Sequence, residues 1–338
     1  MDISLFDYDL PKELIAQKPI EPRDHSRMLV LSEGGLAHDR FYHLPHYLKP
    51  GDLLVFNRTR VLPARLLGRK ADTGGRAECF LLHQVSPEVW SCLVRPGRRI
   101  APGVRLVFGD GGLEGLVEER TEGGGRLVRF RWQGDFEAAL NRAGQVPLPP
   151  YIHEKLDDPE RYQTVYGDKP GSAASPTAGL HFTEDALSGL RAKGVELAQV
   201  LLHVGLGTFR PVDTQVVEDH KMHKEYCEVS EEAAQAVNRA KGEGRRVVAV
   251  GTTALRTLEA MGKTGALQAG AGWTDLYIYP GYRFNMTDGL LTNFHLPRSS
   301  LLMLVSALAG RERVMEAYQE AIREGYRFFS FGDAMLIL

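Results

Sequence analysis

The 338-residue chain is poor in cysteine and has no long apolar run, and both absences narrow the kind of protein it encodes. Its cysteines, Cys79, Cys92 and Cys227, are far apart, which excludes a disulfide framework and a four-cysteine zinc site and suits the reducing cytoplasm. No stretch approaches the roughly 18 apolar residues of a membrane-spanning helix, and the N-terminus lacks a signal-peptide pattern. We therefore expect a cytoplasmic protein of two domains that contacts no membrane.

Familiar nucleotide and hydrolase motifs are also absent. The chain contains no G-x-G-x-x-G fingerprint in the right context, no G-x-x-x-x-G-K-[ST] and no G-x-S-x-G elbow. These absences argue against ordinary dinucleotide, P-loop and serine-hydrolase chemistry.

Charge is nearly balanced overall but unevenly distributed. The formal net charge is −2, yet residues 58–131 carry 14 Lys and Arg against 8 Asp and Glu, a net charge of +6. A basic module on an acidic body indicates a polyanionic partner such as nucleic acid. A solvated, arginine-rich sheet surface is the alternative that charge alone leaves open.

Hydrophobic patterning predicts an α/β body with an inserted all-β, barrel-like domain. Residues 61–149 form the inserted domain, because most of this stretch consists of short apolar runs separated by Gly and Pro turns. The body comprises residues 1–60 and 150–338, in which helical and strand patterns alternate and favour a largely parallel sheet. The expected helices include 184–193 and 231–243, and the expected strands include 53–56, 195–204, 246–250, 275–279, 290–294 and 327–331.

Four polar clusters lie at strand ends or in turns of the predicted body. They are 175–182, with Thr177, Gly179 and His181; 203–209, with His203, Gly205, Gly207 and Thr208; 251–256, with Thr252, Thr253 and Arg256; and 292–297, with Asn293 and His295. Ligands of open α/β sheets bind beyond the carboxyl ends of strands, so we expect these clusters to form one pocket. The alternative is structural, with glycines that only shape turns and histidines that the fold satisfies.

A separate histidine pair raises the question of a metal. If residues 220–225 are helical, His220 and His223 face the same side, and Glu225 or His203 completes a ligand set. The spacing differs from that of H-E-x-x-H, so we expect no metal. A metal-dependent hydrolase that uses His203, His220 and His223 remains an alternative function.

The motifs together resemble those of one enzyme family. In chain order they are PRDHSR (22–27), 52–66, PTAGLHF (176–182), HVGLGTF (203–209), 220–225, GTTALRTLE (251–259), 279–282, LTNFHLP (291–297) and 326–336. Over nearly its whole length the chain is similar to the S-adenosylmethionine:tRNA ribosyltransferase-isomerases of queuosine biosynthesis. The chain departs from that family in the stretch 263–273, which is short and rich in Gly and Ala, and the β region matches it weakly.

This resemblance implies a reaction and its substrates. The ribosyl part of S-adenosylmethionine is transferred to 7-aminomethyl-7-deazaguanine in a tRNA anticodon and isomerised, giving epoxyqueuosine-tRNA with release of adenine and methionine. S-Adenosylmethionine is then a co-substrate, no cofactor is bound, and tRNA is the macromolecular partner. The family's α/β body with an inserted β-barrel agrees with the hydrophobic pattern, and we expect a monomer.

The implied chemistry assigns tasks to the clusters. A base such as His181, His203 or His295 takes the acidified proton beside the sulfonium, and another histidine or Asp288 assists the departure of adenine. The methionine carboxylate binds at Thr252, Thr253 and Arg256. The other cluster residues, Thr177, Gly179, Gly205, Gly207, Thr208 and Asn293, bind substrate, and Tyr282 stacks on the modified base. The expected tRNA phosphate contacts are Arg58, Arg60, Arg95, Arg98 and Arg99.

One further alternative uses the same basic residues without catalysis. A non-catalytic RNA-binding protein would bind RNA through the basic β region and leave S-adenosylmethionine intact. Turnover of S-adenosylmethionine therefore separates it from the transferase, and metal analysis separates the hydrolase.

Overall fold

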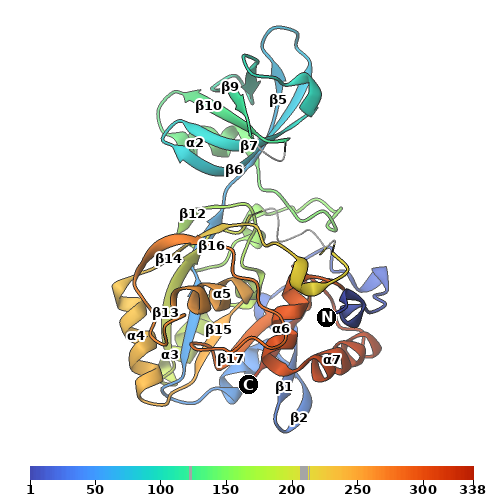
Figure 1. Cartoon of the computed structure of the whole chain (residues 1–338), viewed down its shortest axis with the longest axis vertical. Helices are drawn as coiled ribbons and strands as arrows, with labels where there is room; N and C mark the ends of the chain where they lie inside the picture. The colour runs from blue at the N-terminus through green and yellow to red at the C-terminus, as the bar shows by residue number, and fades with distance from the viewer. Residues whose placement is uncertain (122–123, 206–211, 213) are drawn as a thin grey trace. The chain divides into compact units, whose positions relative to one another are not determined.

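The computed structural model describes residues 1–121, 124–205, 212 and 214–338 and divides the chain into two compact units (Figure 1). Unit 1 comprises residues 1–60, 149–169 and 175–338, and unit 2 comprises residues 61–148 and 170–174. Unit 1 combines a mixed sheet with helices and unit 2 contains a closed β-barrel, so the predicted fold class is confirmed.

A nine-stranded mixed sheet forms the centre of unit 1. Its strand order is β16-β14-β13-β3-β15-β17-β18-β1-β2. The strands are β1 (Arg27–Ser32), β2 (Gly35–Arg40), β3 (Leu53–Asn57), β13 (Glu196–Leu202), β14 (Glu225–Val229), β15 (Val247–Val250), β16 (Gly270–Thr274), β17 (Gly289–Asn293) and β18 (Ala334–Ile337). The four strands β13, β3, β15 and β17 run parallel, whereas β14 and β18 run antiparallel to their neighbours β13 and β17.

Helices cover both faces of this sheet (Figure 1). They are α1 (Leu44–Tyr47), α3 (Glu184–Ala192), α4 (Glu231–Gly242), α5 (Thr252–Met261), α6 (Ser300–Ala309) and α7 (Arg311–Arg323). The apolar run of β3 is buried on both sides: Leu53 and Val55 join the core that contains α4 to α7, while Leu54 and Phe56 join the core that contains α3. This double burial explains why the strand reads as a continuous apolar run.

Two predicted helices of unit 1 are confirmed, together with their starting points. Helix α3 follows Thr183, whose side chain accepts a hydrogen bond from the N–H of Ala186. Helix α4 follows Ser230, whose side chain accepts one from the N–H of Ala233. Acidic residues fill the first turn of both helices, where they interact favourably with the helix dipole.

Two predicted strands are wrong. The strand beside β14 is β16, in the Gly- and Ala-rich stretch, and residues 275–279 follow it without regular structure. The run 327–331 is interrupted because Phe329 has a φ of 70°, and the last strand is β18 instead. The Asp333 carboxylate closes this loop by accepting hydrogen bonds from the N–H groups of Arg27 (3.0 Å) and Arg327 (2.8 Å).

Unit 2 contains a six-stranded antiparallel barrel. Its strands in spatial order are β5 (Arg65–Lys70), β6 (Arg76–Ser86), β7 (Val89–Arg95), β10 (Arg126–Trp132), β9 (Leu113–Arg120) and β8 (Arg105–Phe108), and pairing of β5 with β8 closes it. Closure requires Gly68, because a Cβ there would lie 2.3 Å from the carbonyl oxygen of Val107. Val128 and Phe130 point into the barrel, as the alternation of β10 predicts.

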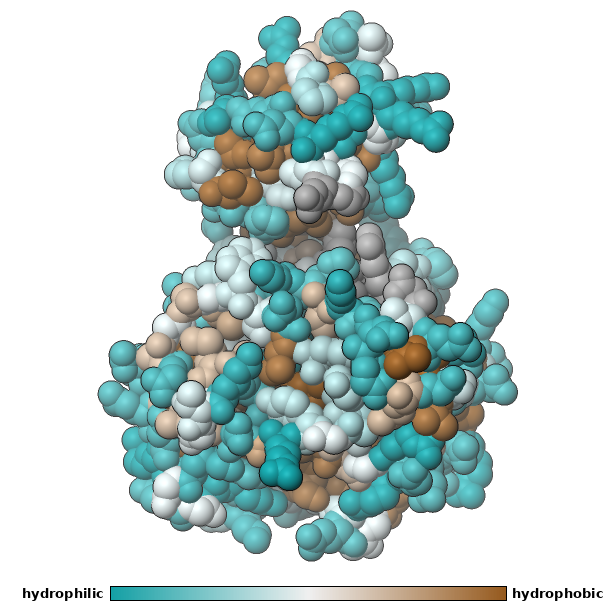
Figure 2. Space-filling model, in the orientation of Figure 1, coloured by the Kyte–Doolittle hydropathy of each residue, from teal (hydrophilic) through white to brown (hydrophobic). Residues whose placement is uncertain are grey.

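Several shorter elements accompany the two large sheets. They are β11 (Gly144–Gln145), which pairs with β5, helix α2 (Phe136–Ala143), and the two-stranded sheet of β4 (Thr59–Val61) and β12 (Lys169–Ser172). Figure 2 shows mostly hydrophilic side chains on the visible face of each unit, with small hydrophobic patches among them. Within the described residues, no helix is both long and apolar enough to cross a membrane.

Candidate active site

The polar clusters that the sequence singles out lie along one edge of the sheet of unit 1. The parallel strands β13, β3, β15 and β17 have their carboxyl ends there, and the antiparallel β14 and β18 begin there. Gly251 lies near the middle of this edge, between the ends of β3 and β17. Gly207 and Thr208 belong to a segment outside the described residues.

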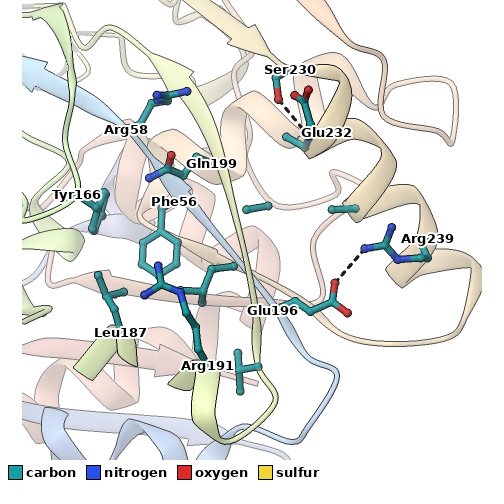
Figure 3. A pocket seen from close by; sticks show the side chains of 15 residues that line it. Phe56, Arg58, Tyr166, Leu187, Arg191, Glu196, Gln199, Ser230, Glu232 and Arg239 are labelled. Atoms are coloured by element: carbon teal, nitrogen blue, oxygen red, sulfur yellow. Dashed lines mark hydrogen bonds and ion pairs between the residues drawn. The ribbon is translucent and has the colours of Figure 1, made fainter. Parts of the chain in front are cut away.

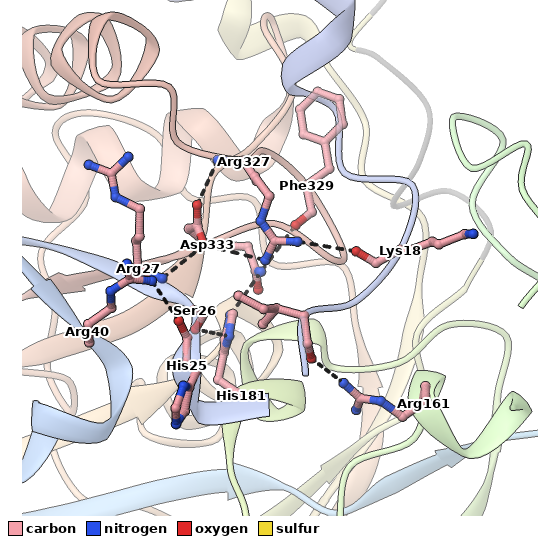
Figure 4. Close-up of polar contacts among 12 residues, drawn as sticks. Lys18, His25, Ser26, Arg27, Arg40, Arg161, His181, Arg327, Phe329 and Asp333 are labelled. Carbon is pink, nitrogen blue, oxygen red and sulfur yellow. Dashed lines mark hydrogen bonds and ion pairs between the residues drawn. The ribbon is translucent and has the colours of Figure 1, made fainter. Parts of the chain in front are cut away.

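His181 is buried at this edge and both of its ring nitrogens are occupied (Figure 4). Its Nδ1 lies 2.8 Å from the Ser26 hydroxyl and its Nε2 lies 3.3 Å from the Asn293 amide nitrogen. The ring also stacks on Phe41, with a centroid separation of 5.2 Å. These contacts come from segments that are more than 100 residues distant in the chain.

The partners of Asn293 determine which nitrogen of His181 carries the proton. The Asn293 amide also donates to the Phe329 carbonyl (3.2 Å), and its oxygen accepts from the Thr177 hydroxyl (3.1 Å). Because the Phe329 carbonyl can only accept, the Asn293 atom that bonds to it is the amide nitrogen. The same nitrogen also faces His181 and donates to Nε2. Nε2 therefore carries no proton, and Nδ1–H donates to the Ser26 hydroxyl. Burial, with smaller contributions from Arg327 and Arg161, lowers the pKa of His181 to about 3. His181 is thus neutral, with its one lone pair engaged.

His203 belongs to a second hydrogen-bonded chain on the other side of Gly251. Its Nδ1 lies 2.8 Å from the Thr59 hydroxyl, and the Thr59 N–H donates to the side-chain oxygen of Asn57 (3.2 Å). The Asn57 amide in turn donates to the Thr253 hydroxyl (3.0 Å). His203 is partly exposed, burial lowers its pKa, and its Nε2 has no partner among the described residues. Of the three candidate histidines it is the most exposed, because His181 and His295 are buried.

The N-terminus of α5 presents backbone donors between these two chains. Gly251 precedes the helix with a φ of 86° and provides no side-chain cap. The N–H groups of Thr252, Thr253 and Ala254 are buried and lack an acceptor within the described part of the chain. Such groups require a partner and favour an anion.

Arg256 lies one turn into α5 and is almost fully buried. Its Nη1 forms an ion pair with Glu225, and its Nε donates to the Leu276 carbonyl (3.1 Å). The other Glu225 oxygen accepts from the Gly205 N–H (3.0 Å). The Nη2 of Arg256 is buried without an acceptor in the described structure. The arginine is therefore held by Glu225 and still offers one donor.

His295 is buried at the same edge but is tied into the core. Its Nε2 lies 3.0 Å from the Thr292 hydroxyl, its N–H donates to Tyr318 (2.9 Å), and its carbonyl accepts from Tyr8. Burial lowers the pKa of His295 to about 3. This environment is typical of a structural histidine.

Two residues predicted for the site lie elsewhere in unit 1. Asp288 precedes β17 at the amino ends of the parallel strands, where it accepts from the Val247 N–H (2.8 Å) and Lys241 (2.8 Å). Tyr282 donates to Glu259 (3.4 Å), in the C-terminal half of α5. Asp288 therefore does not meet the histidines, and the stacking role of Tyr282 stays a prediction.

The packing around Gly179 leaves no room for a side chain. A Cβ at this position would lie 1.9 Å from the Tyr166 hydroxyl and 2.7 Å from Thr164. The glycine therefore admits the Tyr166 ring beneath the 3₁₀ turn Thr177–His181. Its predicted contact with substrate stays untested.

The arginines predicted to contact RNA differ in how they are held. Arg58 and Arg60 form ion pairs with Asp168 and Glu160. Arg58 also lines an open cavity of ≈ 620 Å³ between α3, α4 and β13, whose side chains Figure 3 shows. In the barrel, Arg95, Arg98 and Arg99 are exposed, and no described carboxylate forms an ion pair with them.

The histidine pair considered for a metal is not on a helix. A 3₁₀ turn ends at Asp219, and the chain then lacks regular structure until β14 begins at Glu225. His220 and His223 therefore do not share a helix face, and Glu225 is engaged by Arg256. Among the described residues, no group of three or more His, Cys, Asp and Glu side chains could hold a metal ion.

Sequence reasoning missed Ser26, Asn57 and Thr59, which hold the two histidine chains together. Asn57 and Thr59 directly follow the apolar run of β3, a position at the carboxyl end of a strand that resembles those of the four clusters. Ser26 lacks this strand-end signal, because it precedes β1, which runs antiparallel to the four central strands, but it lies within the motif 22–27 that contributes to the family resemblance.

Comparisons with known proteins agree along the whole chain. The profile of the family described as queuosine biosynthesis protein matches residues 3–337. The S-adenosylmethionine:tRNA ribosyltransferase-isomerases of Symbiobacterium thermophilum and Heliobacterium modesticaldum are 58% and 57% identical to this chain, with 100% of each chain covered. A crystal structure of S-adenosylmethionine tRNA ribosyltransferase from Thermotoga maritima matches with a TM-score of 0.58 and 41% identity over 99% of this chain and 100% of that one. The chain belongs to the queuosine biosynthesis protein family.

Proposed function

We propose that this protein is an S-adenosylmethionine:tRNA ribosyltransferase-isomerase. It transfers the ribosyl part of S-adenosylmethionine to 7-aminomethyl-7-deazaguanine in a tRNA anticodon and isomerises it, which yields epoxyqueuosine-tRNA, adenine and methionine. Full-length relatives that carry this enzyme name are 55–58% identical to the chain, which supports the assignment. The reaction consumes S-adenosylmethionine as a co-substrate, and we expect no bound cofactor.

The observation that carries the placement of S-adenosylmethionine is the unfilled set of donors at the start of α5. The N–H groups of Thr252 and Thr253 and the Nη2 of Arg256 lack acceptors in the described structure. A carboxylate accepts several such hydrogen bonds, and its negative charge is favoured at a helix N-terminus. We therefore assign the methionine carboxylate to this position.

His203 is the residue we assign to proton transfer. The sulfonium of S-adenosylmethionine acidifies the neighbouring C5′–H, so a neutral imidazole can remove this proton and leave an ylide. Burial lowers the pKa of His203, which keeps the basic form populated near neutral pH. Thr59 orients the ring through Nδ1 and leaves Nε2 for the proton. His181, whose two ring nitrogens both bond to the protein, and His295, which is buried in the core with its Nε2 bonded to Thr292, hold the surrounding backbone in place.

The proposed function also suggests a role for the inserted domain, a cellular compartment and an oligomeric state. We infer that residues 61–149 act as an inserted domain that helps to bind tRNA, through exposed arginines such as Arg95, Arg98 and Arg99. A tRNA substrate and three unpaired thiols suit a cytoplasmic enzyme. We further expect the protein to act as a monomer.

The test of the reaction is incubation with S-adenosylmethionine and tRNA that carries the precursor base, followed by mass analysis of the nucleosides. We expect epoxyqueuosine to form with one adenine released per product. Release of adenine without modified nucleoside, or no consumption of S-adenosylmethionine, would contradict the assignment.

The role of His203 is tested by exchange of the C5′ hydrogens of S-adenosylmethionine in deuterated water. The His203→Gln variant should lose this exchange and slow single turnover by about 10²–10⁴-fold, the usual contribution of a general base. His153→Gln is the matched control, because its side chain is exposed. Normal exchange in a folded His203→Gln variant would remove His203 from proton transfer.

A further inference from the structure

An open groove on the outer surface of the barrel concentrates arginines that no described carboxylate neutralises. It has a volume of ≈ 960 Å³ and lies over strands β5, β6, β7 and β8. Arg69, Arg76 and Arg95 line it, and all three are exposed. None of them forms an ion pair with a described acidic residue.

Two of these arginines are direct neighbours across the sheet. Arg69 on β5 pairs in register with Arg76 on β6. Side chains directly opposite on adjacent antiparallel strands have Cβ atoms only about 5 Å apart, and like charges there destabilise the sheet. The protein alone gains nothing from this pair, so the arrangement indicates a negatively charged ligand that lies against both guanidinium groups.

The acidic residue in the groove does not relieve this repulsion. Glu78 stands opposite Leu67 on one side and Arg95 on the other. Its carboxylate bonds instead to the guanidinium of Arg65, at 3.2 and 3.3 Å. The groove therefore keeps an excess of positive charge, which is greatest at the Arg69 and Arg76 pair, because Arg95 stands opposite Glu78.

The shape and composition of the groove favour an extended polyanion over a small anion. Arg76 and Arg95 are diagonal neighbours across β6 and β7, about 7–8 Å apart, so the three cations form a row. Apolar surface flanks this row at Val107, Pro96 and Leu67, of which Leu67 is 43% exposed. A chain of phosphates joined by sugars offers the matching charges and carbon surface.

We propose that this arginine groove of Arg69, Arg76 and Arg95 binds the phosphodiester backbone of RNA, independently of base sequence. The inference rests on the proposed function, because it takes the RNA to be the tRNA substrate. The barrel then contributes to the affinity for tRNA and to the orientation of the bound tRNA, while the reaction takes place in unit 1.

The test is binding of unmodified tRNA over a range of salt concentrations by wild type and by the Arg69→Gln/Arg76→Gln variant. Each lost phosphate contact lowers the slope of log K against log salt by about 0.9, so the double variant should lose about two units. The same relation predicts affinity weaker by about 30-fold at ~0.15 M salt. Arg95→Gln should remove about one further unit.

The matched control is Arg131→Gln. Arg131 is also exposed and lies on the barrel, but on β10, where it pairs in register with Glu114. It removes one positive charge, as Arg95→Gln does, without touching the groove, so the slope should stay near that of wild type. Circular dichroism should show an intact barrel in every variant, because removing Arg69 and Arg76 relieves a repulsion.

Turnover separates failure of this inference from failure of the proposed function. In the double variant KM for tRNA should rise by the same factor as the dissociation constant, with kcat unchanged at saturating tRNA. If the double variant keeps the wild-type slope of log K against log salt, the proposed RNA-binding role of the groove is wrong, whether or not the enzyme is active. A reduced slope in an enzyme that never consumes S-adenosylmethionine supports the groove and contradicts the proposed function. A loss of slope in the Arg131→Gln control equal to that in Arg95→Gln assigns binding to overall charge and overturns the groove.

Discussion

Replacing His181 by alanine should reveal a structural histidine through the stability of the protein and its dependence on pH. The substitution removes a buried ring that stacks on Phe41 and leaves the Ser26 hydroxyl without its partner. A cavity of this size together with one unsatisfied polar group costs about 3–5 kcal/mol of unfolding free energy near neutral pH.

The cost of this substitution should shrink as the pH falls. In the native protein His181 has a pKa of about 3, whereas a histidine in the unfolded chain has a pKa of about 6.5. Between these values the unfolded state binds one more proton, so lowering the pH destabilises the native wild type. The slope is about 1.4 kcal/mol per pH unit, which amounts to about 2 kcal/mol at pH ~5. The alanine variant lacks this histidine and escapes that loss, so its deficit falls to about 1–3 kcal/mol.

The assay is urea unfolding of wild type and His181→Ala between about pH 7 and pH 5. His295 has a similarly lowered pKa and contributes equally to both proteins, so it cancels in the difference. His153→Ala is the control, since its exposed side chain should leave the pH dependence unchanged. A constant difference between wild type and His181→Ala at all pH values would refute the neutral, hydrogen-bonded histidine.

Activity of the same variant separates positioning from proton transfer. Single turnover at low temperature, where His181→Ala stays folded, should remain within about tenfold of wild type. A loss of about 10²–10⁴-fold in the folded variant would restore His181 as the proton-transfer residue.

Other substitutions and one reagent test the remaining contacts. Glu225→Ala should destabilise the protein by about 3–5 kcal/mol in urea unfolding, because Arg256 would keep a buried charge without its counterion; a change below about 1 kcal/mol would show that water reaches the arginine. Gly179→Ala should cost about 1–3 kcal/mol because its methyl meets the Tyr166 hydroxyl, and Tyr166→Phe should recover part of this loss; absence of any recovery would place the clash elsewhere. Treatment with EDTA should leave turnover intact, whereas a loss that one specific divalent ion restores would contradict the expectation of a metal-free enzyme.

Local patterns in the sequence determined most of the architecture. The continuous apolar run of β3 predicts a strand buried on both faces, and the alternation in β10 predicts one barrel face, since burial imposes these periods on any sheet. Thr183 and Ser230 mark the starts of α3 and α4 because their hydroxyls cap the first turn. The family resemblance, which rests on motifs that follow one another along this chain in the family's order, predicted the family that the comparisons confirm.

The tertiary structure decided which polar atoms bond, and therefore which histidine keeps a ring nitrogen that has no partner among the described residues and is partly exposed. His181 and His203 look alike in the sequence, because each has a glycine two residues away and lies at the end of a helical turn or a strand. Only the contacts with Ser26 and Asn293, 155 and 112 residues away, occupy both nitrogens of His181. Strand direction likewise decided that Asp288 lies at the opposite edge of the sheet, because it precedes the strand that Asn293 ends. Periodicity specifies which face of an element is buried, but hydrogen bonds between distant segments exist only once the chain has folded.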